Sequence, residues 1–197
     1  MAHITALDRS DLGEFEVIFE LTETVMGFVP RSMFTMGRNP ALLQAFAQLA
    51  GTVLGPGEVD GGLKQLVGHV ASTAAGCRYC QAHTASSAAR SGVDAGKVEA
   101  VWSFETDDRF TAAERAALRL AHDASSVPNA TTPAHFDDLA EHFSEEQIVE
   151  IVSVISLFGW LNRWNDTMAT DLEDEPLAFG AEHLAASGWD AGKHATR

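Results

Sequence analysis

Cysteine is nearly absent from this sequence, with only Cys77 and Cys80 among 197 residues. Two thiols are too few for the disulfide framework that stabilises small secreted proteins. In a reducing compartment, a pair separated by two residues is more often redox-active or metal-binding than structural. The segment that holds them, AAGCRYCQAHTASSAARSG at 74–92, consists mainly of small residues. We therefore look for a functional site in this segment.

Basic residues are also scarce. The chain has 13 Lys and Arg against 28 Asp and Glu, which gives a formal net charge of −15. A surface with this charge repels phosphate backbones and anionic lipid headgroups. We therefore expect no nucleic-acid partner and no membrane partner.

No hydrophobic run is long enough to span a bilayer. The most apolar stretch, Ile148 to Leu161, has 14 residues and includes Glu150, whereas a membrane helix needs about 20. The N-terminus lacks the basic start and apolar run of a signal peptide, and no Pro-, Gly- or Ser-rich linker divides the chain. We expect one all-helical domain, residues 1–197, in the cytoplasm.

Strand patterns are missing as well, because apolar residues recur at intervals of three and four. We predict an all-α bundle of about eight to ten helices. Asn39 precedes a proline that opens a helix, and capping boxes begin at Thr111 and Ser144. The helix after Ser144 is apolar on every side, which predicts the buried centre of the bundle. The expected helices cover 8–26, 40–54, 60–75 and 77–91, with further starts after 111, 132 and 144 and an amphipathic helix after 176.

The chain contains a weak internal repeat. Residues 65–80 align without a gap over 150–165, and each segment follows a helix that opens with Pro-Ala, at Pro40 and at Pro133. A true duplication predicts two similar helical hairpins packed together, with thiols in the first alone. Because any two apolar helices align in part, chance similarity stays open.

Carboxylates are missing around the thiols. The 33 residues between Asp60 and Asp94 contain none, although 28 are spread over the whole chain. The same window holds Lys64, Arg78 and Arg90. One interpretation is a neutral-to-positive pocket around the sulfurs. The other is that a buried helix of small residues excludes charge of both signs.

A reactive thiol requires help, because thiolate is the reactive form and a thiol of pKa about 8.5 is only ~3% ionised at pH 7. A helix N-terminus contributes about 0.3–1 kcal/mol, which is too little for a shift of two units. His83 follows Cys80 by three residues, so it can reach that sulfur on a helix and is the candidate base. Thr84 lies one turn above Cys80, nearly in line with Cys77. This hypothesis requires one ionised sulfur that solvent can reach.

A metal site is the alternative. Cys77, Cys80 and His83 offer three zinc ligands, and His69 offers a fourth. A closed zinc site usually draws its ligands from two separated clusters, and the sequence has no second cluster of matching spacing. We therefore predict neither a metal nor another cofactor, and we interpret His69 first as a core histidine.

The stretch LKQLVGHVASTAAGCRYCQAHTASSAARSG at 63–92 resembles the signature helix pair, about 60–91, of the carboxymuconolactone decarboxylase superfamily, in its alkylhydroperoxidase D-like (AhpD-like), peroxidase-related branch. The resemblance covers about 30–170 and is most specific in the pattern CxYCxxH. It implies an all-helical homo-oligomer, a dimer, trimer or hexamer.

By the same resemblance, the protein is a thiol-dependent hydroperoxide reductase. Cys80 attacks the peroxide and becomes a sulfenic acid, and Cys77 resolves it as a disulfide. An external dithiol, thioredoxin-like or lipoyl-type, then reduces the disulfide. The helix-dipole argument instead favours Cys77 as the thiol of lower pKa. We follow the resemblance because His83 adjoins Cys80 in the sequence.

Two departures from the family pattern weaken this function. The family usually has a glutamate twelve residues before the first cysteine, where this chain has Gln65, which cannot move a proton. The family histidine usually sits four residues after the second cysteine, where this chain has Thr84. Supporting roles are predicted for Gln65, Tyr79, His69 and Thr84. A redox-sensing or scaffold protein without useful turnover therefore stays open, as does, less strongly, the decarboxylase chemistry that names the superfamily.

Overall fold

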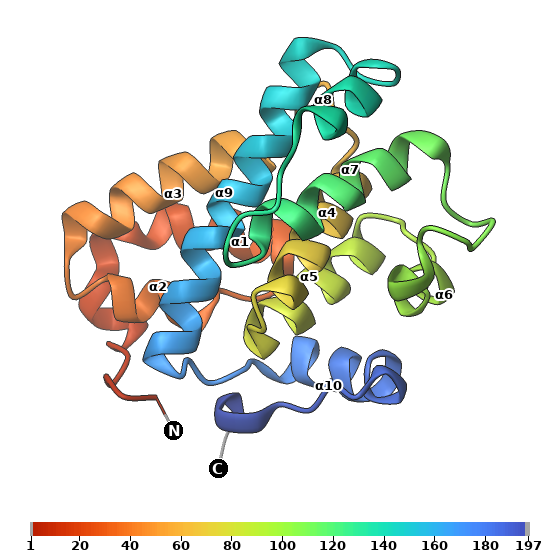
Figure 1. The fold of residues 1–197 in the computed structure, drawn as a ribbon. Coiled ribbons are helices and arrows are strands. Elements are labelled where there is room, and N and C mark those ends of the chain that lie inside the picture. The colour runs from red at the N-terminus through yellow and green to blue at the C-terminus, as the bar shows by residue number, and fades with distance from the viewer. Residues whose placement is uncertain (1, 196–197) are drawn as a thin grey trace.

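Ten α-helices make up most of the computed structural model, which describes residues 2–195, and no strand occurs among these residues (Figure 1). The all-α prediction is therefore confirmed. The α-helices are α1 Glu16–Met26, α2 Arg31–Met36, α3 Pro40–Leu54, α4 Gly61–Ala74, α5 Arg78–Arg90, α6 Ala95–Glu99, α7 Ala112–Ser125, α8 Pro133–Ala140, α9 Glu145–Met168 and α10 Asp174–His183. Short 3₁₀ helices cover Arg9–Phe15, Val101–Ser103, Ala185–Ser187 and Gly192–His194.

Local capping residues determine where several helices begin. The Asn39 side chain accepts a hydrogen bond from the Leu42 N–H group at the start of α3, and Asp60 caps α4 in the same way. Reciprocal capping boxes open α7 at Thr111 and α9 at Ser144, as predicted. Each cap contributes about 1 kcal/mol. These starts are therefore encoded by a few neighbouring residues.

The predicted helix at 8–26 is divided in two. Its first part, Arg9–Phe15, is a 3₁₀ helix in which Leu12 leaves helical geometry, and α1 follows it. Leu12 is buried against Gly37, where an added Cβ would overlap the leucine side chain. Packing against the end of α2 therefore overrides the helical propensity of this segment.

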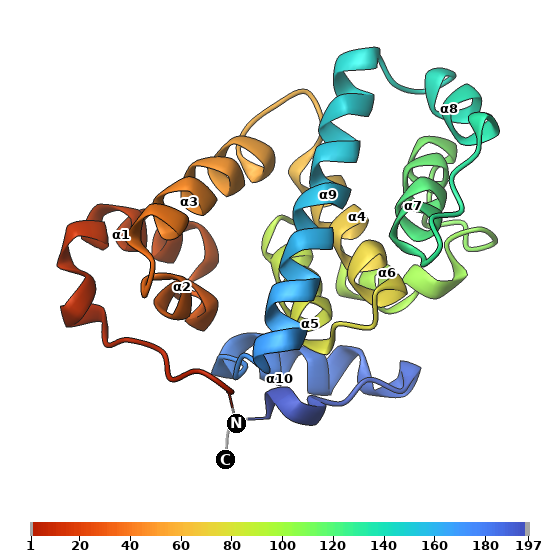
Figure 2. The same cartoon turned by 60° about the vertical axis from the view of Figure 1, so that its left-hand side comes forward.

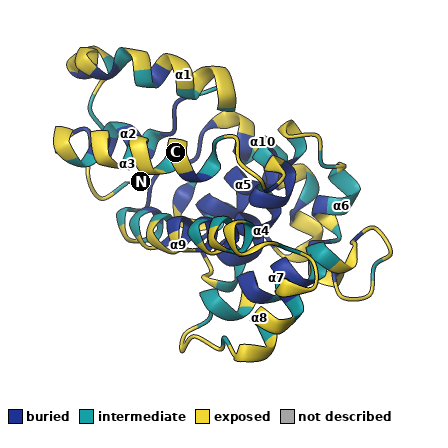
Figure 3. Cartoon of the chain, turned by 90° about the horizontal axis from the view of Figure 1, so that it is seen from above, coloured by how far each residue is buried: buried dark blue, intermediate teal, exposed yellow. Residues whose placement is uncertain are grey.

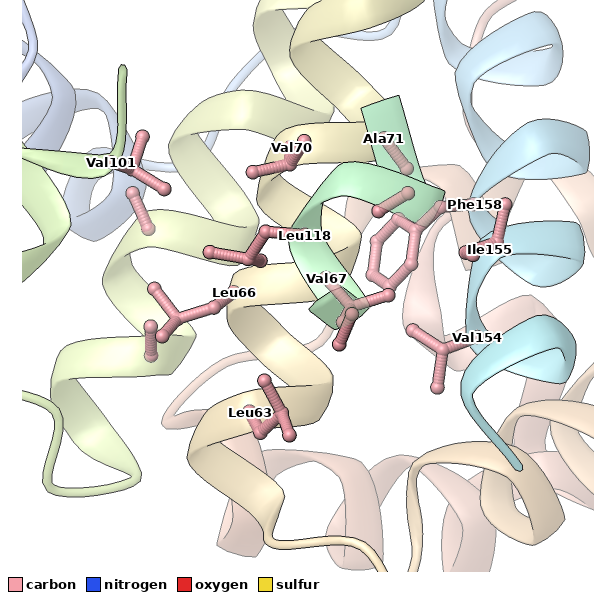
Figure 4. Packing of buried hydrophobic residues seen from close by; sticks show 14 of the residues in the cluster. Leu63, Leu66, Val67, Val70, Ala71, Val101, Leu118, Val154, Ile155 and Phe158 are labelled. Atoms are coloured by element: carbon pink, nitrogen blue, oxygen red, sulfur yellow. The ribbon is translucent and has the colours of Figure 1, made fainter. Parts of the chain in front are cut away.

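The main core is built around α4, which packs against α5, α7 and α9. Buried residues concentrate in α4 and α5 (Figure 3). Val67 and Ala71 of α4 lie beside Phe158 of α9, and Leu118 of α7 joins the same cluster (Figure 4). A Cβ at Gly68 would overlap the Phe158 ring, so glycine permits the close approach of α4 and α9.

A second, smaller core lies among α1, α2 and α3, beside α9 (Figure 2). Stacked rings join this lobe to α9. Phe46 of α3 stacks on Trp160, and Trp160 stacks on Trp164, with 5.3 Å between ring centroids in both pairs. The lobe therefore covers one face of α9, while α4 covers another.

The third face of α9 is open to solvent, which corrects the prediction that this helix is buried on all sides. Val149 is 65% exposed and Val152 is 37% exposed. The hydroxyls of Ser153 and Ser156 donate to carbonyls one turn earlier in α9, so this face leaves no serine unpaired. No helix in the described residues has the length and apolarity to cross a membrane.

The proposed repeat is visible only in part. Helices α3 and α8 open at Pro40 and Pro133 as predicted, and α4 packs against α9. In the first copy, α4 ends at Ala74 and α5 begins at Arg78. In the second copy, α9 is one continuous helix through the aligned residues 150–165. The two segments therefore differ where the first one carries its thiols.

Candidate functional site

A sharp break between α4 and α5 positions the two thiols. Gly76 takes φ = 75°, a left-handed conformation that glycine adopts with little strain. Cys77 follows as the N-cap residue of α5, and Cys80 lies in the first turn. The Cys77 N–H group donates to Ser72 O at 3.0 Å, which ties the turn to α4. Both sulfurs therefore lie at the positive end of the α5 dipole.

Two groups from distant segments meet at Cys77. A carboxylate oxygen of Asp166, in α9, and a ring nitrogen of His194, in the last 3₁₀ helix, lie within 4.8 Å of each other and of Cys77 Sγ. His194 Nδ1 lies 2.7 Å from Thr170 O, so Nδ1 carries the proton and Nε2 presents a lone pair. Burial lowers the pKa of His194, which keeps the ring neutral at pH 7. Asp166 Oδ1 lies 3.7 Å from His194 Nε2 and 2.9 Å from Lys193 Nζ.

Cys80 lies deeper, against α9. Asn165 Nδ2 donates to its sulfur at 3.5 Å. The Thr84 hydroxyl donates to the Cys80 carbonyl oxygen at 2.7 Å. The Asn165 contact joins the first turn of α5 to α9, whereas the Thr84 hydrogen bond lies within α5.

The two thiols differ in how readily they ionise. A hydrogen bond from the Cys80 thiol lowers the pKa of Cys77 against the effect of burial, and backbone N–H groups of the first turn lower it further. Burial, together with the neighbouring Cys77, raises the pKa of Cys80 well above that of a free thiol. Cys77 therefore ionises first. These pKa directions favour Cys77 over Cys80 as the more readily ionised thiol, as the helix-dipole argument also does.

Both sulfurs are covered, which contradicts the expectation of a thiol pair open to solvent. Cys77 is 1% exposed and Cys80 is 2% exposed. Of the two interpretations of the carboxylate-free stretch, the neutral-to-positive pocket does not agree with the structure, because Asp166 approaches Cys77 from α9 and Glu173 enters from the segment before α10. A carboxylate-free stretch of sequence does not exclude carboxylates that other helices supply.

His83 belongs to a buried polar group beside the thiols. Its Nε2 lies 2.6 Å from Glu173 Oε2, and Tyr79 Oη donates to Glu173 Oε1 at 3.0 Å. The Arg31 N–H group also donates to Glu173. Burial alone would raise the pKa of Glu173, but His83 and the Arg31 N–H group lower it, so the side chain is a carboxylate. Among the described residues no hydrogen bond joins His83 to Cys80, and the His83 Nε2 atom is instead held by Glu173.

Two further predicted residues, His69 and Thr84, contact each other. His69 Nδ1 lies 3.1 Å from both Thr84 Oγ1 and Gln81 O. Burial lowers the pKa of His69 to about 4, so the ring is neutral at pH 7, and its Nε2 has no hydrogen-bond partner within the described residues. His69 is therefore a core histidine, as first interpreted. Gln65 is half-buried in α4.

Two hollows flank the α4–α5 turn. A groove of about 860 Å³ reaches Ala75, Asn162 and Asp166, so Asp166 lies between the groove and Cys77. A cavity of about 450 Å³ lies on the other side of the turn, where Gly76 and His69 form part of its lining. The groove walls include the apolar side chains of Leu120, Val127, Phe136, Val152 and Ile155.

Comparison with known proteins places the chain in a family. The model of the carboxymuconolactone decarboxylase family matches residues 40–123. The crystal structure of the apo debrominase Bmp8 matches with a TM-score of 0.86 and 39% identity, over 91% of this chain and 97% of Bmp8. The chain belongs to the carboxymuconolactone decarboxylase family. This confirms the family resemblance of the cysteine segment.

Other relatives show how the family varies. A Cys-to-Ala variant of Bmp8 in complex with 2,3,4-tribromopyrrole matches with a TM-score of 0.87 and 37% identity, over 92% of this chain and 99% of that one. A peroxidase-related protein with an AhpD core, from Ralstonia eutropha JMP134, shares the fold with a TM-score of 0.78 at 21% identity, over 89% and 94% of the chains. YdfG of Bacillus subtilis strain 168 is 28% identical over 91 residues, which span 46% of this chain and 60% of YdfG.

Proposed function

We propose that this protein is a dithiol-dependent reductive dehalogenase that acts on polybrominated pyrroles or similarly small halogenated aromatic rings. The main support is Cys77, an ionisable sulfur beside Asp166 and His194 with a second thiol three residues away, in a chain 39% identical to a debrominase over nearly its full length. A Cys-to-Ala variant of that debrominase binds tribromopyrrole, which fits a reaction at a cysteine.

The reaction assigns a separate role to each thiol. The Cys77 thiolate takes the bromine, so that an S–Br bond forms, the C–Br bond breaks and the electron pair stays on the ring carbon. His194 Nε2 holds the proton that Cys77 released and passes it to this carbon, while Asp166 stabilises the imidazolium. The Cys80 thiol then attacks the Cys77 sulfur, and a disulfide forms with loss of bromide and a proton. An external dithiol, thioredoxin-like or lipoyl-type, restores the thiols.

The large groove is the proposed binding site for the ring. The apolar side chains in its wall, such as Val152 and Ile155, suit a flat halogenated ring, and polar groups such as Asn162 line the same groove. The groove reaches Asp166, whose side chain is 47% exposed and separates the groove from Cys77. Rotation of Asp166 would open a path from the groove to the sulfur. Arg163 also lines the groove. Bromine substituents acidify a pyrrole N–H group, so a guanidinium is a suitable partner for the resulting anion.

Bromide release tests this function. The reduced protein is incubated with 2,3,4-tribromopyrrole and excess dithiothreitol, bromide is measured by ion chromatography, and the ring products are identified by mass spectrometry. We expect turnover in the wild type and a loss of roughly 10³-fold or more in Cys77→Ser, because that variant lacks the nucleophile. His122→Gln, on the exposed surface of α7, is the control. Full activity in Cys77→Ser would refute the assignment.

Hydroperoxide reduction is the second candidate, because the CxxC pair and the AhpD-like fold both suit it. In that reaction the attacking sulfur takes one peroxide oxygen, an alcohol leaves, and the sulfenic acid then loses water as the disulfide forms. Gln65 and Thr84 replace the usual acid–base residues. Glu150 cannot substitute for them, since it binds the Glu58 N–H group at the far end of α4, about 20 Å from the thiols along the helix.

The same samples separate these functions. Turnover of cumene hydroperoxide without bromide release would assign the protein to hydroperoxide reduction. Disulfide formation without turnover of either substrate would assign a redox-sensing role. We also propose that the chain forms a homo-oligomer, a dimer, trimer or hexamer, which light scattering of the purified protein tests.

A further inference from the structure

The group at Cys77 includes a buried ring nitrogen that is free to bind a ligand when no substrate is present. His194 is 1% exposed, yet its Nε2 has no hydrogen-bond partner among the described residues. This nitrogen points toward Cys77 Sγ and the Asp166 carboxylate, and the three ligand atoms all lie within 4.8 Å of one another. A buried imidazole that lacks a partner on one nitrogen is costly unless something else binds there.

The other ring nitrogen has the arrangement found in metal-binding histidines. His194 Nδ1 donates to Thr170 O at 2.7 Å, which fixes the tautomer and turns the Nε2 lone pair inward. Metal-ligating histidines nearly always donate their second nitrogen to a carbonyl or carboxylate in this way. The unpaired nitrogen and the fixed tautomer are two independent observations that point to a ligand.

We propose that Cys77, Asp166 and His194 form a binding site for Zn²⁺, and that the bound ion caps the nucleophilic sulfur and holds the enzyme inactive. A thiolate, an imidazole and a carboxylate are the side chains that Zn²⁺ prefers. In a tetrahedral site, metal–ligand distances of about 2.0–2.3 Å separate neighbouring ligand atoms by roughly 3.5 Å. The three atoms reach that spacing by closing about 1 Å. Zinc replaces the thiol proton, which goes to solvent, and no electron is transferred.

This site is not the zinc site considered from the sequence. That set combined the two cysteines with His83 and His69, but His83 is held by Glu173 and His69 binds Gln81 O and Thr84. The proposed site takes one sulfur from the pair and leaves Cys80 out. A fourth position stays open for water, as in zinc sites with three protein ligands.

A substitution at Lys193 should raise the zinc affinity, whereas loss of a ligand should lower it. The Lys193 Nζ atom lies 2.9 Å from Asp166 Oδ1. Lys193→Met removes a positive charge next to the proposed ion, so zinc affinity should rise roughly fivefold in this solvent-exposed position. Loss of a ligand must lower the affinity, so the two kinds of variant move it in opposite directions.

Metal binding is measured directly, without reference to activity. Reduced protein is titrated with Zn²⁺ against a chromophoric chelator, and with Co²⁺, whose near-ultraviolet charge-transfer band reports thiolate ligation. We expect the wild type to bind one equivalent. We expect zinc binding to weaken more than about 100-fold in each ligand variant, Cys77→Ser, His194→Gln and Asp166→Asn. This loss is larger than that from removing a residue that only hydrogen-bonds to a metal ligand. Cys80→Ser keeps a hydroxyl donor next to the Cys77 sulfur and should lose no more than about tenfold. The surface controls His122→Gln and Asp108→Asn should bind zinc as the wild type does.

Two outcomes would overturn the site. Unchanged affinity in both His194→Gln and Asp166→Asn would exclude these ligands, and equal losses in Cys77→Ser and Cys80→Ser would show a dithiolate site instead. Circular dichroism confirms that each variant is folded. The wild type oxidised to the Cys77–Cys80 disulfide provides a second measurement without any substitution, and it should bind no Zn²⁺.

The inhibitory role rests on the proposed function, so it is tested separately. Stoichiometric Zn²⁺ should slow alkylation of Cys77 by iodoacetamide at least tenfold, and chelation should reverse this. Bromide release should fall in parallel. A protein that binds Zn²⁺ at this site but releases no bromide when metal-free would refute the dehalogenase and keep the metal site. Bromide release that Zn²⁺ does not slow would refute the cap.

Discussion

Acidification should destabilise the protein through His69. This imidazole is 1% exposed, and burial lowers its pKa to about 4 from the ordinary value of 6.5. The folded pKa lies below the unfolded one, so between pH 6.5 and pH 4 the unfolded chain binds more protons. Stability is therefore lost as the pH falls through this window. The two pKa values give a loss of about 2 kcal/mol at pH 5 and about 3 kcal/mol once the pH is below 4.

The assay is urea unfolding of the wild type and of His69→Gln at pH 8, 6.5 and 5, followed by tryptophan fluorescence. Carboxylates with lowered pKa, such as Glu173, also lose stability in acid, so the informative quantity is the difference between the two proteins. We expect the wild type to lose about 2 kcal/mol more than His69→Gln between pH 8 and pH 5. His122→Gln, which changes an exposed histidine, should follow the wild type. A difference that stays constant with pH would refute the neutral, buried state of His69.

Three further predictions follow from the site and the core. Iodoacetamide should modify Cys77 at lower pH than Cys80, as peptide mapping of the partly alkylated protein can show; modification of Cys80 first would contradict the pKa directions derived above. Glu173→Gln should lower the free energy of unfolding by about 1–3 kcal/mol, because it removes a buried carboxylate that accepts from Tyr79 Oη and the Arg31 N–H group and lies against His83 Nε2, and an unchanged urea midpoint would argue against these contacts. Gly68→Ala should cost about 1–3 kcal/mol through overlap with a phenylalanine of α9, whereas Gly159→Ala, which has open space, should not destabilise the protein.

The elements that could be predicted from sequence are those that depend on neighbouring residues. The starts of α3, α7 and α9 follow from caps and capping boxes that span four residues, and the structure contains each of them. The position of the thiols at the start of α5 follows from the Gly76 break and the CxYCxxH pattern. Local hydrogen bonds decide all of these features, so a short window of sequence contains the necessary information.

The chemistry around the sulfurs depends on residues that no local window includes. Glu173 lies 90 positions after His83, and Asn165 lies 85 positions after Cys80. His194 reaches Cys77 from the end of the described chain. The absence of carboxylates between Asp60 and Asp94 in the sequence therefore did not predict the charges that surround the sulfurs in space. Similarly, apolar residues occur on every side of α9. The sequence therefore did not show which face of this helix stays exposed after α4 and the N-terminal lobe pack against the others.

Tyr79 is the single tyrosine in the chain. Its ring stacks on His83 with 4.2 Å between centroids, and its hydroxyl binds Glu173. Replacing tyrosine by 3-fluorotyrosine during expression would therefore place exactly one fluorine nucleus in the protein, two residues from Cys77 and next to Cys80. One ¹⁹F resonance would then report sulfur oxidation and proton uptake at this position, with no background from the rest of the molecule.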